Sequence, residues 1–244
     1  MLHWIDYQLK KLTRPDTVRC GTAVLHIGDL ARTSYARSIY RDTHEQEERT
    51  VISRHLSADD RVLEFGTGLG LVTVLCCQVV GGENVTTYEA NPRMEPLLRK
   101  TFELNGVQPD LRMKMVSISD DDGTFFVSDR FVVSSRIQHD GTAREMQIPS
   151  DSFQTVLDQI RPTFLIMDIE GTETDLADES IDLSCLKKIC VEVHPQITGD
   201  EATSRLVQSL MNRGFELQLS SCQGDVLYFQ RPAAAAGQSE QQAA

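Results

Sequence analysis

The sequence lacks the long apolar segments that would place the protein in or across a membrane. Its longest nearly apolar run, residues 69–80, is about a dozen residues long, which is too short for a hydrocarbon layer of roughly 30 Å. Residues 1–30 also lack the continuous apolar stretch and the small-residue cleavage site of a secretory signal. We therefore expect a protein that is neither exported nor stably inserted in a membrane.

Paired cysteines and an excess of positive charge are missing as well. The six cysteines show no CxxC spacing, and most of them lie in apolar runs, as is typical of reduced thiols packed as small hydrophobic side chains. Lysine and arginine number 24 against 36 aspartates and glutamates, which gives a formal net charge of -12. Because surfaces that bind nucleic acid are basic, we expect no nucleic-acid partner. The reduced cysteines lead us to expect a cytoplasmic location.

The apolar content is sufficient for a sizeable core, and it is arranged in alternating strands and helices. At 244 residues and 40% hydrophobic content, one domain with small additions is expected. The expected strands are 61–65, 84–89, 112–117, 163–169, 187–193 and a closing hairpin of 215–221 and 224–230, and the expected helices are 70–80, 92–105, 151–160 and 200–212. This alternation predicts an α/β, Rossmann-like fold with a mainly parallel seven-stranded sheet and helices on both faces.

Three segments fall outside this alternation. Residues 1–58 predict an N-terminal accessory or lid segment, residues 123–148 predict an inserted β-hairpin region, and residues 232–244 predict a disordered tail. The core domain is then expected to span residues 59–231.

Within the accessory segment, the apolar spacing before Pro15 predicts a helix, and two short strands are expected around Gly21. For this helix we favour packing onto the domain; a lid, a homodimer element and a membrane-surface helix are the alternatives. The acidic helical stretch at residues 45–48 is interpreted as a solvated face, with closure over a cofactor as the alternative.

A glycine turn follows the first core strand. Gly66, Thr67, Gly68 and Gly70 form a GxGxG pattern, in which the glycines allow a tight turn and a close approach to a ligand at the start of a helix. Dinucleotide-binding proteins typically use GxGxxG. Glu64, before the turn, would repel a pyrophosphate but could support the ammonium of S-adenosylmethionine (AdoMet), often through water. The turn therefore favours AdoMet over NAD, and a ligand-free connection is the alternative.

Further cofactor contacts are expected at the ends of the second and third strands. Glu89 lies 23 residues after Gly66, close to the position where an acidic side chain accepts both ribose hydroxyls in nucleotide-binding sheets. Ala90 follows it, and Ser117 and Ile118 are placed where a loop could contact adenine. The alternatives are an exposed strand-end charge at Glu89 and a solvated acidic turn after Ser117.

A second group of polar residues follows the two later parallel strands. Asp168 and Glu170 would face the same way if their strand persists, and so would Glu192 and His194 before Pro195 ends theirs. Because ligands bind at the carboxyl ends of such strands, we expect these side chains to meet the glycine turn at one edge. Burying several carboxylates is costly unless a cation, a proton or a substrate compensates. The alternative is capping and salt bridges at strand ends.

Residues 40–230 resemble the FkbM-type methyltransferases, class I AdoMet-dependent enzymes that mostly methylate hydroxyl groups of natural products and sugars. The most specific match is MDIEGTE at residues 167–173, which is similar to the family's K-I-D-V-E-G-x-E, and VEVHP at residues 191–195 is a second match. Ile166 stands in place of the family lysine, and EFGTGLG departs from the family's D-V-G-A-N-x-G turn. The resemblance implies AdoMet as the cofactor and a small hydroxylated molecule as the methyl acceptor.

Methyl transfer is an in-line displacement that depends on alignment, and a hydroxyl acceptor must also lose its proton. His194 or Asp168, with Glu192 beside them, is the expected proton acceptor; alternatively, these three residues hold a divalent ion. Glu170 and Glu173 are expected to bind the substrate or else to brace the following turn. The alternatives to O-methylation are N- or carboxyl-methylation, nicotinamide-dependent oxidation and non-catalytic AdoMet binding.

Overall fold

The computed structural model describes residues 2–118, 123–127 and 144–232. At its centre lies a seven-stranded sheet in the order β12-β13-β11-β10-β3-β4-β5. The strands are β3 (Val62–Phe65), β4 (Val85–Tyr88), β5 (Asp110–Arg112), β10 (Phe164–Met167), β11 (Lys188–Glu192), β12 (Glu216–Leu217) and β13 (Val226–Gln230). The first five are parallel, and β13 runs antiparallel to both β11 and β12. The predicted α/β fold with a mainly parallel seven-stranded sheet is therefore confirmed.

The order of the strands reverses at β3. Its neighbour on one side is β4, the next strand of the sheet along the chain, and on the other side is β10, which comes about a hundred residues later. In open α/β sheets, ligands bind outside the carboxyl ends of the strands at such a reversal. The topology thus marks the ends of β3 and β10 as the place for a site.

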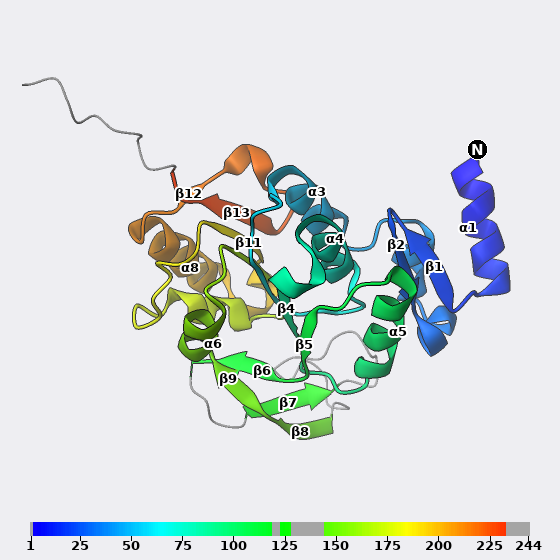
Figure 1. Ribbon diagram of the computed structural model, residues 1–244, viewed down its shortest axis with the longest axis horizontal. Coiled ribbons are helices and arrows are strands. Elements are labelled where there is room, and N and C mark those ends of the chain that lie inside the picture. Colours follow the sequence, from blue (N-terminus) through cyan, green and yellow to red (C-terminus); the bar gives the residue numbers. More distant parts are fainter. Residues whose placement is uncertain (1, 119–122, 128–143, 233–244) are drawn as a thin grey trace, which may run out of the picture.

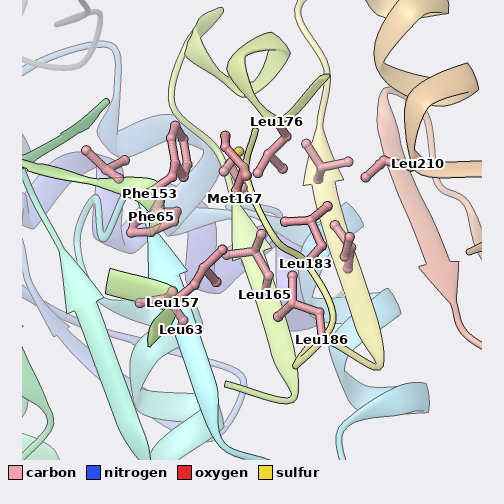
Figure 2. Close-up of a cluster of buried hydrophobic side chains, with 14 of the residues drawn as sticks. Leu63, Phe65, Phe153, Leu157, Leu165, Met167, Leu176, Leu183, Leu186 and Leu210 are labelled. Atoms are coloured by element: carbon pink, nitrogen blue, oxygen red, sulfur yellow. The ribbon is translucent and has the colours of Figure 1, made fainter. Parts of the chain in front are cut away.

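Helices cover both faces of the sheet, so its central strands are buried throughout. All residues of β3, β4 and β10 are buried, as expected for parallel strands between two helical layers. Figure 2 shows one of these layers, where Leu63, Phe65, Leu165 and Met167 of the sheet pack against Phe153 and Leu157. The opposite face packs against α3 (Gln46–His55) and α4 (Leu71–Val80).

The other helices follow the predicted alternation. They are α5 (Glu95–Asn105), α6 (Phe153–Ile160), α7 (Pro195–Thr198) and α8 (Asp200–Asn212), with short 3-10 helices η2 (Gly82–Asn84), η3 (Thr172–Ala177) and η4 (Leu219–Ser221). Among the helices in the described ranges, none has both the length and the apolar composition needed to cross a membrane.

The N-terminal segment packs beside the sheet (Figure 1). It contains α1 (Leu2–Thr13), β1 (Thr17–Cys20), β2 (Ala23–His26), η1 (Gly28–Arg32) and α2 (Ala36–Tyr40). The backbone amide of Val24 donates to Asn105 Oδ1 at 2.9 Å, and that of His26 donates to Thr101 Oγ1 at 3.0 Å. These bonds fix β2 to α5. The two predicted strands around Gly21 are therefore present and pair antiparallel.

Helix α1 packs on one side only. Tyr7 contacts a buried cluster of the N-terminal segment and lies under the Arg41 guanidinium at 4.8 Å, whereas Trp4, Leu9 and Leu12 are exposed. The favoured interpretation of this helix, packing onto the domain, thus holds for one of its faces and not for the apolar residues on the other.

The predicted third strand, residues 112–117, is wrong as a single element. The chain turns after Arg112, where the amide of Lys114 donates to the Arg112 carbonyl at 3.0 Å. It then enters β6 (Met115–Ser117), which leaves the main sheet and pairs parallel with β9 (Ser150–Ser152). The inserted hairpin is present as β7 (Gly123–Val127) and β8 (Arg144–Ile148), which pair antiparallel. The predicted tail falls on residues 233–244, outside the described residues, and so does part of the hairpin region.

Candidate active site

A cavity of about 340 Å³ opens where the order of the strands reverses. Its walls come from the glycine turn after β3, from the residues after β4 and β10, from the end of β11, and from the N-terminal segment. The lining residues include Tyr35, His44, Glu45, Glu47, Glu48, Gly66, Gly68, Glu89, Ala90, Asn91, Lys114, Asp168, Ile169, Glu170 and Glu192. The two groups of polar residues expected from the sequence therefore share one cavity.

The glycine turn fits tightly against the neighbouring strands. Gly66 has φ +93°, and a β-carbon there would lie 1.8 Å from the carbonyl oxygen of Asp168. The amides of Gly66 and Thr67 both donate to the Tyr88 carbonyl, at 3.0 and 3.1 Å. Only glycine permits this backbone approach. Gly66 and Gly68 line the cavity, as expected of a ligand-binding turn.

Two other residues of the turn have packing roles. Thr67 is buried, and its hydroxyl lies 2.6 Å from that of Thr87. Gly70 has φ +79°, and a β-carbon there would lie 2.8 Å from Phe102 Cε1 on α5. Neither residue lines the cavity. Their assignment to the cofactor is corrected accordingly: they hold the turn in place.

Glu89 lies at the cavity wall with both carboxylate oxygens positioned by backbone amides. Oε2 accepts from the Gly68 amide at 3.0 Å, and Oε1 accepts from the Asn91 amide at 2.7 Å. Burial raises the pKa of Glu89 to about 7, although these hydrogen bonds act in the opposite direction. A carboxylate has lone pairs beyond the two used here, so Glu89 can still accept hydroxyl donors from the cavity.

Glu64 does not reach the cavity, and the expected contact with a methionine ammonium is corrected. Its side chain points to the opposite side of β3 from Leu63 and Phe65, toward α4, where the Thr73 hydroxyl donates to it. It is only 2% exposed, and burial raises its pKa to about 8. Glu64 is thus a buried structural carboxyl group rather than a lining residue.

Glu45, rather than Glu64, is the carboxylate that lies beside the glycine turn. Its backbone has φ +49°, and its Oε1 lies 3.3 Å from where a β-carbon of Gly68 would be. Oε1 also lies 3.2 Å from His44 Nε2. Oε2 is buried and accepts no hydrogen bond from the part of the chain that the structure describes. A carboxylate oxygen without a partner therefore lies beside the glycine turn.

The whole acidic stretch before the first core strand borders this cavity. Glu45, Glu47 and Glu48 all line it, and the favoured interpretation of residues 45–48 as a solvated face holds for exposed Glu47 but not for buried Glu48. Burial alone would lower the pKa of His44, but the Glu45 carboxylate raises it above its ordinary value. The Tyr35 hydroxyl lies 3.3 Å from His44 Nε2. The alternative, closure of this stretch over a cofactor, stays a prediction.

On the opposite wall, three carboxyl groups surround the ring of His194. His194 Nε2 lies 3.5 Å from Asp168 Oδ1, 3.7 Å from Glu170 Oε2 and 3.9 Å from Glu192 Oε1. Asp168, Glu170 and Glu192 line the cavity, whereas His194 is buried behind them. The predicted meeting of these four residues is therefore present in the structure.

They meet for a different reason than the one expected. β10 ends at Met167 and β11 ends at Glu192, so the strands do not persist through the second residue of each pair. Instead, Glu170 has φ +50° and Gly171 has φ +101°, and this turn directs Glu170 toward the cavity.

Two carboxyl groups of this wall, those of Asp168 and Glu192, have raised pKa values. Burial raises the pKa of Asp168 to about 7, although His194 acts to lower it. Burial and the charges of Asp168 and Glu48 raise the pKa of Glu192 to about 10, and the Glu192 side chain hydrogen-bonds to that of Glu48. Burial alone would lower the pKa of His194, but the surrounding carboxylates raise it.

Glu173 braces this wall from behind and has no access to a substrate. It is fully buried. Its Oε1 accepts from the His194 amide at 2.9 Å and lies 3.2 Å from His194 Nδ1, while Oε2 accepts from the Gly171 amide at 2.7 Å. The assignment of Glu173 to the substrate is corrected, and the alternative, bracing of the turn, describes its contacts.

The two residues expected to contact adenine after the third strand do not line the cavity. Ser117 is buried with its hydroxyl 2.9 Å from that of Ser150, and Ile118 is exposed. Lys114, Met115 and Val116 line it instead, and Lys114 is paired with Asp151 at 2.7 Å.

The cavity is strongly acidic. Among the described residues that line it, Lys114 is the only lysine or arginine, while the acidic ones are Glu45, Glu47, Glu48, Glu89, Asp168, Glu170 and Glu192. Those of the seven carboxyl groups that are ionised create a negative potential, which attracts cations and repels anions.

No protein-family model and no curated protein matches the chain, so the resemblance to the FkbM-type enzymes stays a prediction. Solved structures with a similar backbone include the ribosomal protein L11 methylase from Lactobacillus delbrueckii subsp. bulgaricus, with 13% identity over 78% of this chain and 81% of that chain and a TM-score of 0.46. Another is M. jannaschii TYW2 in complex with AdoMet, with 14% identity over 88% of this chain and 86% of that chain and a TM-score of 0.44. A third is the O-methyltransferase from Bacillus cereus in complex with SAH, with 13% identity over 77% of this chain and 81% of that chain and a TM-score of 0.44. At these identities, the chemistry of the site has to be inferred from the side chains of the cavity itself.

Proposed function

We propose that the protein is an AdoMet-dependent methyltransferase that acts on a hydroxyl group of a small molecule. The observation that carries this proposal is the acidic cavity at the reversal of strand order, with the glycine turn and Glu89 on one side and Asp168, Glu170 and Glu192 on the other. One space thus offers a nucleoside site next to groups that can take up a proton.

The charge of the cavity favours AdoMet over a nicotinamide dinucleotide. A pyrophosphate would lie among carboxylates, with no arginine among the described residues that line the cavity, whereas a sulfonium and an ammonium would be attracted. The unpartnered Oε2 of Glu45 is the group best placed to accept from the ammonium. Glu89 is proposed to accept the ribose hydroxyls, and the apolar side chains of Leu30, Met94, Met115 and Val116 would contact the adenine.

AdoMet would supply an electrophilic methyl group. The protein would align an acceptor hydroxyl with it and remove the hydroxyl proton. We assign the proton uptake to Asp168 rather than to His194, because Asp168 lines the cavity and its Oδ1 accepts no hydrogen bond within the described residues. Glu170, which also lines the cavity, would hold a second polar group of the substrate.

The test uses the full chain and calorimetry with AdoMet, S-adenosylhomocysteine and NAD. We expect the first two to bind and NAD to give no heat. Glu89→Gln should weaken AdoMet binding, whereas Glu83→Gln, which removes the same charge at an exposed position, should not. Tight binding of NAD with no response to AdoMet would refute the proposal.

The acceptor class is tested by incubating the protein with AdoMet and a metabolite extract, and by searching for products heavier by one CH₂ unit. Asp168→Asn should abolish their formation while AdoMet still binds. The acidic wall of the cavity, formed by Asp168, Glu170 and Glu192, would also bind an ammonium, which favours an amine as the second candidate acceptor. Fragmentation of the product separates a methyl ether from a methylamine.

A further inference from the structure

Three potential metal ligands converge on one point of the acidic wall. One oxygen each of Asp168 and Glu192 and one ring nitrogen of His194 all lie within 4.8 Å of one another. His194 Nε2 is 3.5 Å from Asp168 Oδ1 and 3.9 Å from Glu192 Oε1. Two ligands at right angles around an ion, each about 2.1–2.3 Å from it, are about 3.0–3.3 Å apart. The two distances from Nε2 are longer than this by less than about 1 Å, so side-chain rotations that draw the two carboxylates inward would enclose an ion.

The ring of His194 is oriented as a metal ligand would be. Its Nδ1 lies 3.2 Å from Glu173 Oε1, and because that carboxylate also accepts from the amides of His194 and Gly171, Nδ1 is the donor. In the neutral ring, the lone pair is then on Nε2, which faces the carboxylates. A buried carboxylate that holds the second nitrogen of a ligating histidine is the usual outer-shell partner in metal sites.

The Asp168 oxygen that faces Nε2, Oδ1, is shielded from solvent and accepts no hydrogen bond in the described part of the chain, although it lies 3.5 Å from Nε2. A carboxylate oxygen that faces an imidazole lone pair is unfavourable unless a positive charge, either a proton or a metal ion, lies between them. Asp168 lines the cavity and its side chain is 38% exposed, so an ion would have access from the solvent.

We propose that Asp168, Glu192 and His194 bind a divalent cation that accepts mixed nitrogen and oxygen ligands, such as Mn²⁺. Cation binding stands on these contacts alone. Its consequence for catalysis rests on the proposed methyltransferase function: a cation here would bind the acceptor hydroxyl and lower its pKa, so that proton removal would no longer depend on Asp168 as the sole acceptor.

The experiment titrates chelator-treated full-length protein with Mn²⁺ and follows the ion by electron paramagnetic resonance. We expect one Mn²⁺ per chain, and nitrogen modulation of its spin echo from the coordinated imidazole. ¹⁵N-labelling of histidine should change that modulation in the wild-type protein, which needs no substitution. Mn²⁺ that does not bind, or binds without nitrogen modulation, would overturn the proposal.

Substitutions locate the ligands. Asp168→Asn and His194→Gln should each weaken Mn²⁺ binding by at least about tenfold, and His194→Gln should remove the nitrogen modulation. Glu47→Gln is the matched control, because it removes a charge from the same cavity at an exposed position, and it should leave binding unchanged. Equal losses in Glu47→Gln and His194→Gln would show non-specific attraction and contradict the site.

Calorimetry with AdoMet on the same samples separates the two proposals. If AdoMet binds and Mn²⁺ does not, the cation site is wrong and the proposed function stands. If Mn²⁺ binds with nitrogen modulation and AdoMet does not, the cation site stands and the proposed function is wrong.

Discussion

The backbone of Gly66 lies so close to the carbonyl oxygen of Asp168 that a β-carbon on Gly66 would be 1.8 Å from that oxygen. The two residues follow β3 and β10, which pair directly although they are distant in the sequence. The glycine turn and the acidic wall therefore meet through backbone contact, and a change at either strand end alters both.

Gly66→Ala should destabilise the fold by more than about 3 kcal/mol, because the added carbon overlaps a backbone atom and φ is positive. Gly106→Ala is the matched control. It has φ +64° but nothing within 4 Å of its β-carbon position, so only the backbone cost of about 1–2 kcal/mol applies. Denaturant titration measures both, and equal losses would mean that the strand ends can separate without penalty.

Glu45→Gln should weaken AdoMet binding roughly tenfold, or by about 1.4 kcal/mol, because it removes the charge of a carboxylate that lies beside the glycine turn and whose Oε2 accepts no hydrogen bond within the described residues. Glu47→Gln removes the same charge from an exposed part of the cavity rim, where solvent screens it, and should have little effect. Calorimetry compares the two variants. An equal effect of both would point to the overall charge of the cavity rather than to a contact of Glu45.

Glu64→Gln should change how stability depends on pH. The folded-state pKa of Glu64 is about 8, against an ordinary value of 4.5, so the native protein keeps a proton that the unfolded chain has lost. The contribution of Glu64 to the free energy of unfolding therefore falls as pH rises between these values. A glutamine cannot ionise, so the variant should gain stability relative to wild type over this range, on the order of 5 kcal/mol in total.

Denaturant titration at about pH 5, 7 and 9 measures this gain. The difference between variant and wild type should grow up to about pH 8 and then level off. Parallel pH profiles of the two proteins would show that Glu64 ionises normally despite its burial.

Glu173→Gln should disturb the orientation of His194 and cost roughly 1–3 kcal/mol of stability. Three donors face the Glu173 carboxylate, and a glutamine has only one oxygen to accept from them. ¹⁵N chemical shifts at high pH, where the ring is neutral, should show protonation at Nδ1 in wild type and a mixture of tautomers in the variant. Exposed Glu179→Gln is the control, and an unchanged tautomer in Glu173→Gln would contradict the bracing role.

Most of the fold could be predicted because its signals are local. The continuous apolar strands VLEF and FLIM, and the glycines that follow them, predict buried parallel strands ending in turns. The third strand was wrong, since residues 112–117 suit a strand throughout, and the turn at Lys114 depends on β6 pairing with β9, more than thirty residues later.

The candidate site was predictable only in part. The ends of parallel strands bring Glu89, Asp168 and Glu192 to one edge by topology alone. The sequence pattern carries no signal for which side of β3 Glu64 faces relative to the cavity, nor for the left-handed backbone of Glu45 that places its carboxylate beside Gly68. The full burial of Glu173 likewise follows from tertiary packing.

The antiparallel strand β13 is the last strand of the sheet to be synthesised. β11, which carries Glu192 at its end, is bordered on one side by β10 and on the other by β13, residues 226–230. While the chain is being synthesised, the glycine turn, α3 and Asp168 all emerge before that last strand does. Until then β11 is an open sheet edge, which can pair with other chains. The pairing of Glu192 with Val226 can therefore form only after β13 has been synthesised, and a chain that stalls before residue 226 would leave β11 as an exposed edge strand.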